Sequence, residues 1–126
     1  YLLNTVKDGI DMVERVGHPR FQLHYDTHHA HIEEQDPGAA IRSGAAAIGH
    51  VHISESDRGV PGRGQVAWEA SFEALKEIGY DDWLVIEAFS RRDPDFANAI
   101  HVWRDFAPAD EIWREGLEFI RQSWAS

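Results

Sequence analysis

Three residues whose side chains commonly bind metal ions stand at or near the ends of short apolar segments. Asp26 ends FQLHYD, His52 lies in GHVHIS, and Glu87 follows the apolar part of DWLVIEAF. At the carboxyl ends of successive parallel strands, such side chains meet at one end of an α/β barrel. Two carboxylates and one imidazole suit a hard or borderline divalent cation. The sequence therefore predicts a site for Mn²⁺, Mg²⁺, Co²⁺ or Zn²⁺.

Each of these residues also has a structural alternative. Asp26 could cap a turn, His52 could be a hydrogen-bonded core histidine, and Glu87 could be a solvated strand end. Side chains alternate along a strand, so His24 shares a face with Asp26, and His50 shares a face with His52. The same alternation places all three candidate ligands inward without a break in the pleat, which favours the joint metal site.

Polar residues near these strand ends are candidates for substrate contact. His29 lies three residues after Asp26, close enough to reach the same cavity, whereas His28 and His31 are better read as surface residues. Arg58 follows His52 in a Gly/Pro loop, where its planar guanidinium could clamp substrate oxygens or remain solvated.

Alternating strand and helix patterns must position these side chains. Apolar runs predict strands, and amphipathic or small-residue patterns predict helices. Between the first strand and the second helix, THHAHIEEQD reads as a polar turn. The expected strands cover 21–26, 49–54 and 82–89, and the expected helices cover 2–16, 37–49, 68–78, 94–106 and 109–124. This order predicts parallel strands with right-handed crossovers, as in part of a (β/α)8 barrel.

Composition restricts the class of partner. The 126 residues have the length of one domain and carry 12 Lys and Arg against 22 Asp and Glu, for a net charge of −10. That balance disfavours nucleic acid and anionic membrane surfaces. The sequence has no cysteine, which excludes disulfides and thiolate metal sites. No bilayer-length apolar run or signal peptide is visible, so we expect a cytoplasmic protein.

Several motifs carry a family resemblance that runs nearly end to end: YLLNT, YDTHHAHIEE, GHVHISESDRGVPGRGQVAW, LKEIGYDDWLVIEAF and VWRDF. Together they resemble the C-terminal part of the ketose 3-epimerases of the D-tagatose/D-psicose type. These enzymes belong to the xylose isomerase-like TIM-barrel superfamily. The resemblance implies that residues 1–126 are a partial barrel domain with about three parallel strands, flanked by helices.

The resemblance also implies roles for particular residues. It places Asp26, His52 and Glu87 as ligands of a divalent metal, Mn²⁺ first, and His29 and Arg58 as sugar-binding residues. Glu87 would also be one of two acid/base carboxylates that move a proton beside a metal-polarised carbonyl through an enediolate. The expected substrate is a small ketose, and the full-length protein is expected to be a homo-oligomer.

The chain departs from the family pattern in two ways. The family's second catalytic Glu precedes the segment resembling YLLNT, and it has no counterpart here. Because residue 1 is Tyr and the only Met is Met12, the chain is either processed or a piece of a longer protein, and the resemblance favours the piece. Without the second Glu, we expect the chain alone to be nearly inactive. Near the pocket, His28 and His31 replace the Phe and Asn common in the sugar epimerases, and EAF replaces EPF or ESF.

Other functions remain open from the sequence. Hydroxypyruvate isomerases and inosose dehydratases share the strand-end ligands. Relatives of endonuclease IV are disfavoured, because they must bind DNA and the chain is acidic. A non-catalytic half-barrel that serves as a binding or assembly module is an alternative of another class.

Overall fold

Short strands and helices alternate through the part of the chain that the computed structural model describes, residues 2–126. Tyr1 lies outside the described residues. The strands are β1 (Leu23–Asp26), β2 (Ile48–Ile53) and β3 (Leu84–Ile86). The helices are α1 (Val6–Val16), α2 (Thr27–Glu33), α3 (Pro37–Ser43), α4 (Trp68–Glu77), α5 (Pro94–Ala99) and α6 (Ala109–Ala125).

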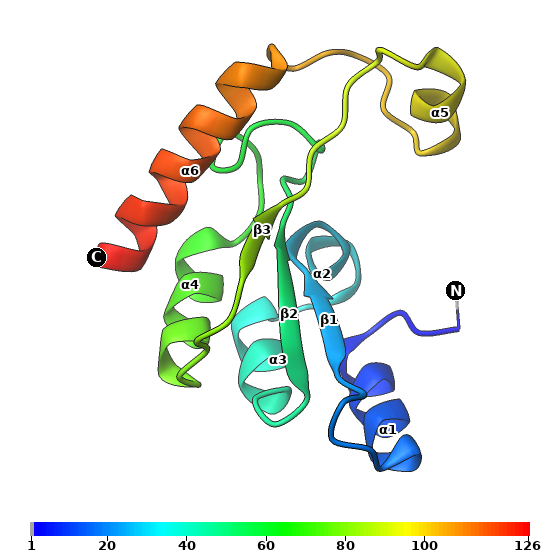
Figure 1. The fold of residues 1–126 in the computed structure, drawn as a ribbon, viewed down its shortest axis with the longest axis vertical. Coiled ribbons are helices and arrows are strands. Elements are labelled where there is room, and N and C mark those ends of the chain that lie inside the picture. Colours follow the sequence, from blue (N-terminus) through cyan, green and yellow to red (C-terminus); the bar gives the residue numbers. More distant parts are fainter. Residues whose placement is uncertain (1) are drawn as a thin grey trace.

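The strands form one parallel sheet in the order β1-β2-β3 (Figure 1). Asp26 is the register partner of His52, and Ile53 is the partner of Ile86. The backbone N–H of Glu87 donates to the carbonyl of Ile53, 3.0 Å away, which continues the pairing one residue past β3. Parallel pairing in chain order therefore brings the three strand ends together.

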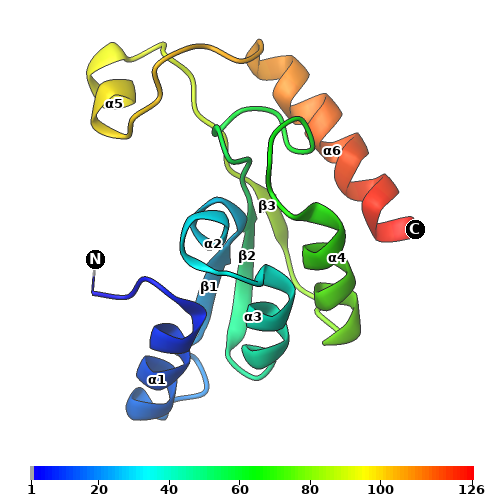
Figure 2. The same ribbon diagram turned by 180° about the vertical axis from the view of Figure 1, so that it is seen from behind.

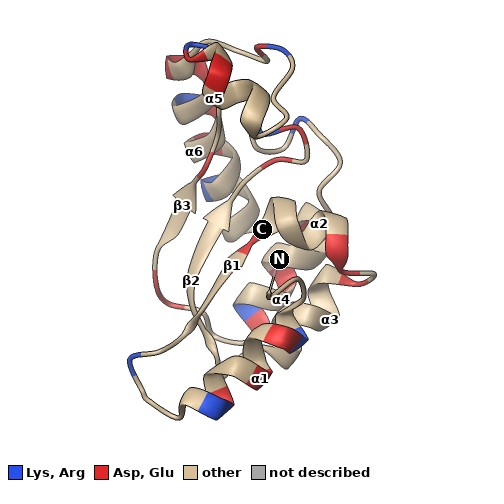
Figure 3. Ribbon diagram, turned by 90° about the vertical axis from the view of Figure 1, so that its right-hand side faces the viewer, with Lys and Arg blue, Asp and Glu red and all other residues tan. Residues whose placement is uncertain are grey.

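The helices α2, α3 and α4 cover one face of this sheet, as the views from behind and from the side show (Figures 2 and 3). The side chains of β1 and β2 that face these helices pack with residues of α4 in a core of Tyr25, Val51, Ile53, Phe72 and Leu75. On the opposite face, Trp83 is 75% exposed and Val85 is 37% exposed. A parallel sheet covered on one face only has the form of a barrel wall, with the bare face toward the barrel interior.

Local chemistry sets the first helix boundary. Thr5 is the N-cap of α1, and its hydroxyl accepts from the backbone N–H of Asp8, while the Asp8 carboxylate accepts from the N–H of Thr5. This capping box begins the helix at Val6 rather than at residue 2, and Leu2 is exposed. At the other end, Gly17 adopts φ 62°, the left-handed conformation that glycine tolerates best.

One predicted turn is a helix. The segment from residue 27 is α2, not a polar turn, because the Asp26 side chain caps its N-terminus and Thr27 and Ala30 are buried. The following helix, α3, ends at Ser43 instead of residue 49, and β2 begins at Ile48. The sequence pattern overlooked α2 because the helix is only seven residues long and contacts the sheet through small side chains.

The C-terminal segment also differs from expectation. The helix predicted over 94–106 ends at Ala99, and His101 has a φ of 62°. The final helix, α6, agrees with the prediction and packs against α4 and β3. Among the described residues, none of the helices combines the length and the apolar composition needed to cross a membrane.

Candidate metal centre

The structure brings Asp26, His52 and Glu87 together. One ligand atom from each side chain lies within 4.8 Å of the others. His52 Nδ1 is 3.3 Å from Glu87 Oε1 and 3.8 Å from Asp26 Oδ2. The three side chains come from the ends of β1, β2 and β3, as the sequence predicted, and the cluster has the donor set of a divalent cation site.

The two oxygens of Asp26 face different partners. Oδ1 accepts hydrogen bonds from the backbone N–H groups of His28, at 2.8 Å, and His29, at 3.0 Å. Oδ2 faces His52 and Arg58, each 3.8 Å away. Asp26 therefore has the capping role that was its structural alternative, and it also faces the other candidate ligands. The N-terminus of α2 fixes the Asp26 carboxylate through Oδ1 and leaves Oδ2 available to bind a cation.

His52 provides the test of whether a cation fits. Its Nδ1 is buried, and no hydrogen-bond partner for this nitrogen occurs among the described residues. The nearby Glu87 oxygen lies within reach but is not aligned for a hydrogen bond. A buried nitrogen without a partner is costly, and a cation between the imidazole and the two carboxylates would satisfy it. The residues present thus fit a metal ion.

Arg58 is the cationic residue of this cluster. Its Nη1 donates to Glu87 Oε2 at 2.5 Å and to Ser54 Oγ at 2.8 Å, and its guanidinium lies 5.2 Å from the centre of the Phe89 ring. The side chain is only 13% exposed. Its backbone φ of 66° is left-handed, which costs a non-glycine residue about 1–2 kcal/mol. The fold holds this arginine in a strained but well-anchored position.

The histidines of α2 occupy two environments beside Arg58. His29 Nε2 lies 3.1 Å from Arg58 Nη2, and because arginine can only donate, that nitrogen is the acceptor. His28 Nδ1 lies 3.1 Å from the carbonyl of Glu55, so it is the donor there. Burial is the main cause that lowers the pKa of the His28 imidazole, and the positive charge of Arg58 lowers it further. His28, read from sequence as a surface residue, is instead half-buried.

A buried carboxylate that the sequence pattern does not indicate holds the loop that carries Arg58. Glu55 is fully buried and accepts from the backbone N–H groups of Ser56, Gly62 and Val66 and from the indole N–H of Trp68. Burial alone would raise the pKa of Glu55, but these hydrogen bonds outweigh it and lower the pKa from 4.5. Its signal in the sequence was weak: one acid before a Gly/Pro-rich loop.

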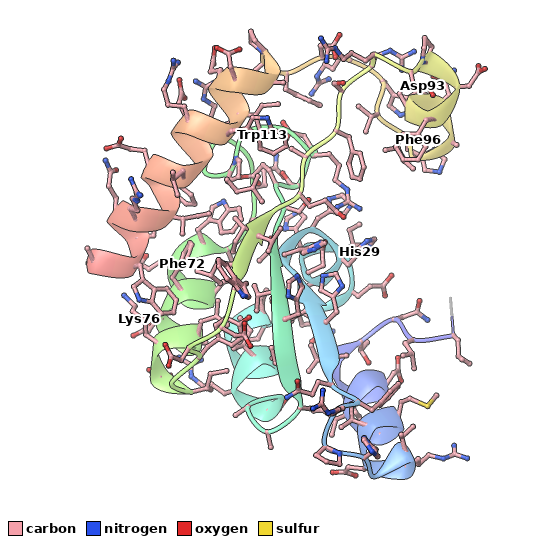
Figure 4. The ribbon with its side chains drawn as sticks, viewed as in Figure 1. His29, Phe72, Lys76, Asp93, Phe96 and Trp113 are labelled. Atoms are coloured by element: carbon pink, nitrogen blue, oxygen red, sulfur yellow. The ribbon has the colours of Figure 1, made fainter. Side chains whose placement is uncertain are left out.

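Two concave regions adjoin the cluster. One, of about 330 Å³, is lined by Asp26, His29, Glu87 and residues of the α1 start. The other, of about 590 Å³, lies between α2 and the α5 loop and is lined in part by His28, His29, Arg58 and His101. Figure 4 places His29 on α2, near the carboxyl ends of β1 and β2. His29 lines both regions, whereas His31 lines neither.

Glu34, at the end of α2, links this helix to α1. Glu34 accepts from the backbone N–H of Val6 at 2.7 Å, so it supports the start of α1. In the side view, Lys and Arg residues lie on several different elements (Figure 3).

Comparison with known proteins places this geometry in a family. A family model described as the xylose isomerase-like TIM barrel matches residues 1–123. The chain is 43% identical over 112 residues to a D-psicose 3-epimerase of Ruminiclostridium cellulolyticum, covering 88% of this chain and 38% of that protein. It is 38% identical over 126 residues to an L-ribulose 3-epimerase of Mesorhizobium japonicum, covering 98% of this chain and 40% of the relative.

Solved structures agree with the sequence matches. A structure of L-ribulose 3-epimerase superimposes with a TM-score of 0.92 at 38% identity, covering 98% of this chain and 43% of the other. A Methylomonas D-allulose 3-epimerase in complex with D-allulose gives 0.90 at 36% identity, covering 97% and 43%. The chain thus spans about two fifths of these relatives' length. Three parallel strands of a partial barrel were predicted and are confirmed, and the chain belongs to the xylose isomerase-like TIM-barrel family.

Proposed function

We propose that this chain supplies part of the active site of a metal-dependent ketose 3-epimerase. One observation carries the proposal: His52 Nδ1, which has no hydrogen-bond partner in the described part of the chain, faces the Asp26 and Glu87 carboxylates at the strand ends. The similarity to D-psicose and L-ribulose 3-epimerases supports the choice of reaction. The substrate class is a small ketose.

Asp26 Oδ2, His52 Nδ1 and the Glu87 carboxylate would hold the cation, with Mn²⁺ as the first expectation and Co²⁺, Mg²⁺ or Zn²⁺ as alternatives. When bound, the cation would supply Lewis-acid polarisation of the ketose carbonyl. The α2 N-terminus keeps the Asp26 carboxylate oriented toward this position. His52 contributes a neutral ligand, so the charge of the site is set by Asp26, Glu87 and Arg58.

Glu87 is proposed as one of the two acid/base groups. Its carboxylate would take the proton from C3, beside the C2 carbonyl, and the electron pair of the C–H bond would form an enediolate. A proton returned to C3 from the opposite face would give the epimer. That second donor corresponds to the family's other Glu, which has no counterpart in these 126 residues. We therefore expect the chain alone to have little epimerase activity.

Arg58 and His29 are proposed to hold the sugar oxygens. In the structure Arg58 pairs with Glu87 and contacts His29, so these polar groups already face the same space. A bound cation would compete with Arg58 for Glu87, which would free the guanidinium for a substrate oxygen. Its positive charge would then stabilise the negative oxygen of the enediolate.

An isomerase of another substrate class is the second candidate. The chain is 31% identical over 88 residues to a 2-oxo-tetronate isomerase of Cupriavidus necator, covering 69% of this chain. A full-length protein of that kind would act on a sugar acid instead of a ketose. In either case, we expect the full-length protein to be a homo-oligomer, which its sedimentation would show.

The test is a panel of ketoses and 2-oxo sugar acids assayed with the full-length protein. Metal is first removed with a chelator, and Mn²⁺ is then added back. The expected result is interconversion at C3 of at least one ketose, lost on chelation and restored by Mn²⁺. Conversion of sugar acids alone would favour the second candidate, and C3 epimerisation that survives chelation would refute the metal-dependent mechanism.

A further inference from the structure

A second group of possible metal ligands lies on the bare face of the sheet. His24 on β1 is the register partner of His50 on β2, and His52 lies two residues further along β2 on the same face. The ring centres of His24 and His52 are 4.0 Å apart, and each lies 5.1 Å from the centre of His50. His24 and His50 sit one step below the strand-end carboxylates, toward the amino ends of the strands, whereas His52 is level with Asp26.

We propose that His24, His50 and His52 form a second cation site, selective for Zn²⁺ and similar borderline ions, that shares His52 with the carboxylate site. One nitrogen from each ring lies within 4.8 Å of the others. A tetrahedral Zn²⁺ with imidazole ligands places their nitrogens about 3.3 Å apart, as follows from Zn–N bonds of about 2.0–2.1 Å. Small side-chain rotations would close the difference.

The surroundings of the three imidazole rings indicate that the rings bind an ion and do not merely fill space. Barrel interiors are mainly filled with branched apolar side chains, and three adjacent imidazoles are unusual filling. Among the described residues, no protein group hydrogen-bonds to the ring nitrogens of His24 or His50. Their lone pairs are therefore free to bind a cation.

Ligand chemistry separates this site from the carboxylate site. Three neutral imidazoles bring no negative charge, so Mg²⁺ and Mn²⁺, which prefer oxygen ligands, gain little there. Zn²⁺, Ni²⁺ and Cu²⁺ bind imidazole more strongly, in keeping with the usual order of divalent affinities. The two neighbouring clusters thus differ in selectivity, because the histidine site disfavours the Mn²⁺ and Mg²⁺ that the carboxylate site accepts.

Sharing His52 makes the two sites competitive. A neutral imidazole has one nitrogen that accepts and one that carries a proton, so it ligates one ion at a time. Zn²⁺ at the histidine site would remove His52 from Asp26 and Glu87 and weaken binding at the carboxylate site. Zn²⁺ is therefore expected to inhibit the enzyme without directly replacing the cation bound by the carboxylates.

The test measures Zn²⁺ affinity of the full chain by competition with a chromophoric chelator. Three single variants are compared with the unmodified protein: His24→Gln, which removes a ligand of the histidine site alone, Asp26→Asn, which removes a ligand of the carboxylate site alone, and His18→Gln, an exposed histidine distant from both. We expect His24→Gln to lose at least about tenfold in Zn²⁺ affinity, equal to about 1.4 kcal/mol. Asp26→Asn and His18→Gln should retain the affinity.

Co²⁺ provides an independent readout, since its visible absorption reports tetrahedral nitrogen ligation. The tetrahedral band should be present in Asp26→Asn and absent in His24→Gln. Should His24→Gln fail to fold by circular dichroism, His50→Gln takes its place. Equal Zn²⁺ affinity in His24→Gln and the unmodified protein, or an equal loss in His18→Gln, would overturn the site. Neither measurement depends on epimerase activity, so the proposed function stands or falls separately.

Discussion

At the scale of single residues, the site is a balance between two carboxylates and one guanidinium. Arg58 lies 2.5 Å from a Glu87 oxygen and 3.8 Å from an Asp26 oxygen, so it partly neutralises the charge that would attract a cation. His52 adds a buried nitrogen without a hydrogen-bond partner in the described part of the chain. This arrangement leads to opposite expectations for Glu87 and Arg58.

Glu87→Gln should abolish turnover of the full-length enzyme while leaving the fold intact. The amide keeps the size of the side chain but cannot act as a base or supply a negative ligand. Turnover is measured with the best ketose of the panel, and the fold by circular dichroism. Glu14→Gln, on the exposed side of α1, is the control. If turnover remains within about tenfold, or about 1.4 kcal/mol of barrier, Glu87 is not the base.

Arg58→Gln should raise the Mn²⁺ affinity while weakening ketose binding. Arg58 is ion-paired with Asp26 and Glu87, so removing the guanidinium leaves the negative charge of both carboxylates available to attract the cation. Calorimetry would give the Mn²⁺ affinity, and steady-state kinetics would give KM and kcat. Arg92→Gln, on the exposed loop, should change neither. Weaker Mn²⁺ binding in Arg58→Gln would contradict the electrostatic argument.

At the scale of elements, helix ends and one loop place these side chains. The N-terminus of α2 orients Asp26, and Thr27 ties the ends of β1 and β2 by accepting from the Ser54 N–H and donating to the Ser54 carbonyl. The loop of residues 55–66 wraps around the Glu55 carboxylate, and this loop presents Arg58 in its left-handed conformation. The loop's shape therefore depends on one buried charge.

Glu55→Gln should destabilise the protein and flatten its response to acid. An amide accepts with one oxygen only, and unsatisfied buried N–H groups cost about 1–3 kcal/mol. Because the folded-state pKa of Glu55 lies below its ordinary value of 4.5, its ionisation stabilises the fold above that pH. This stabilisation is lost as the pH falls through the folded-state pKa.

Urea unfolding between about pH 6 and about pH 3 measures both effects. The unmodified protein should lose stability below its ordinary glutamate pKa, and Glu55→Gln should lose less over the same range. Glu69→Gln, in the exposed first turn of α4, serves as the control and should follow the unmodified protein. Parallel curves for Glu55→Gln and the unmodified protein would rule out a contribution from Glu55 ionisation.

At the scale of the whole molecule, the chain has a sheet with a bare face and open edges. Within the described residues, β1 and β3 each pair on one side only, and Trp83 is 75% exposed. Open strand edges and exposed aromatic side chains promote association. The relatives are more than twice as long as the segment matched here, in keeping with a wall of a larger barrel.

The 126-residue chain should therefore self-associate in solution. Sedimentation velocity over a range of concentrations should show mass above the 14.3 kDa of one chain, increasing with concentration. Trp83→Arg, which places a charge on the bare face, should reduce the association. A constant monomer mass at every concentration would show that the bare face does not cause self-association.

The sequence by itself was sufficient for the alternation of strands and helices and for the grouping of Asp26, His52 and Glu87. The reason is physical: apolar periodicity reports strands, and parallel strands in chain order must end at the same edge. Tertiary structure alone decided that residues from 27 form α2, that His28 is half-buried, and that Glu55 organises the loop around Arg58. The first two outcomes depend on contacts between residues distant in the chain, such as Thr27 with Ser54 and His28 with Glu55, which local pattern does not encode. The third depends on a loop that closes around one buried side chain, which has no periodic pattern.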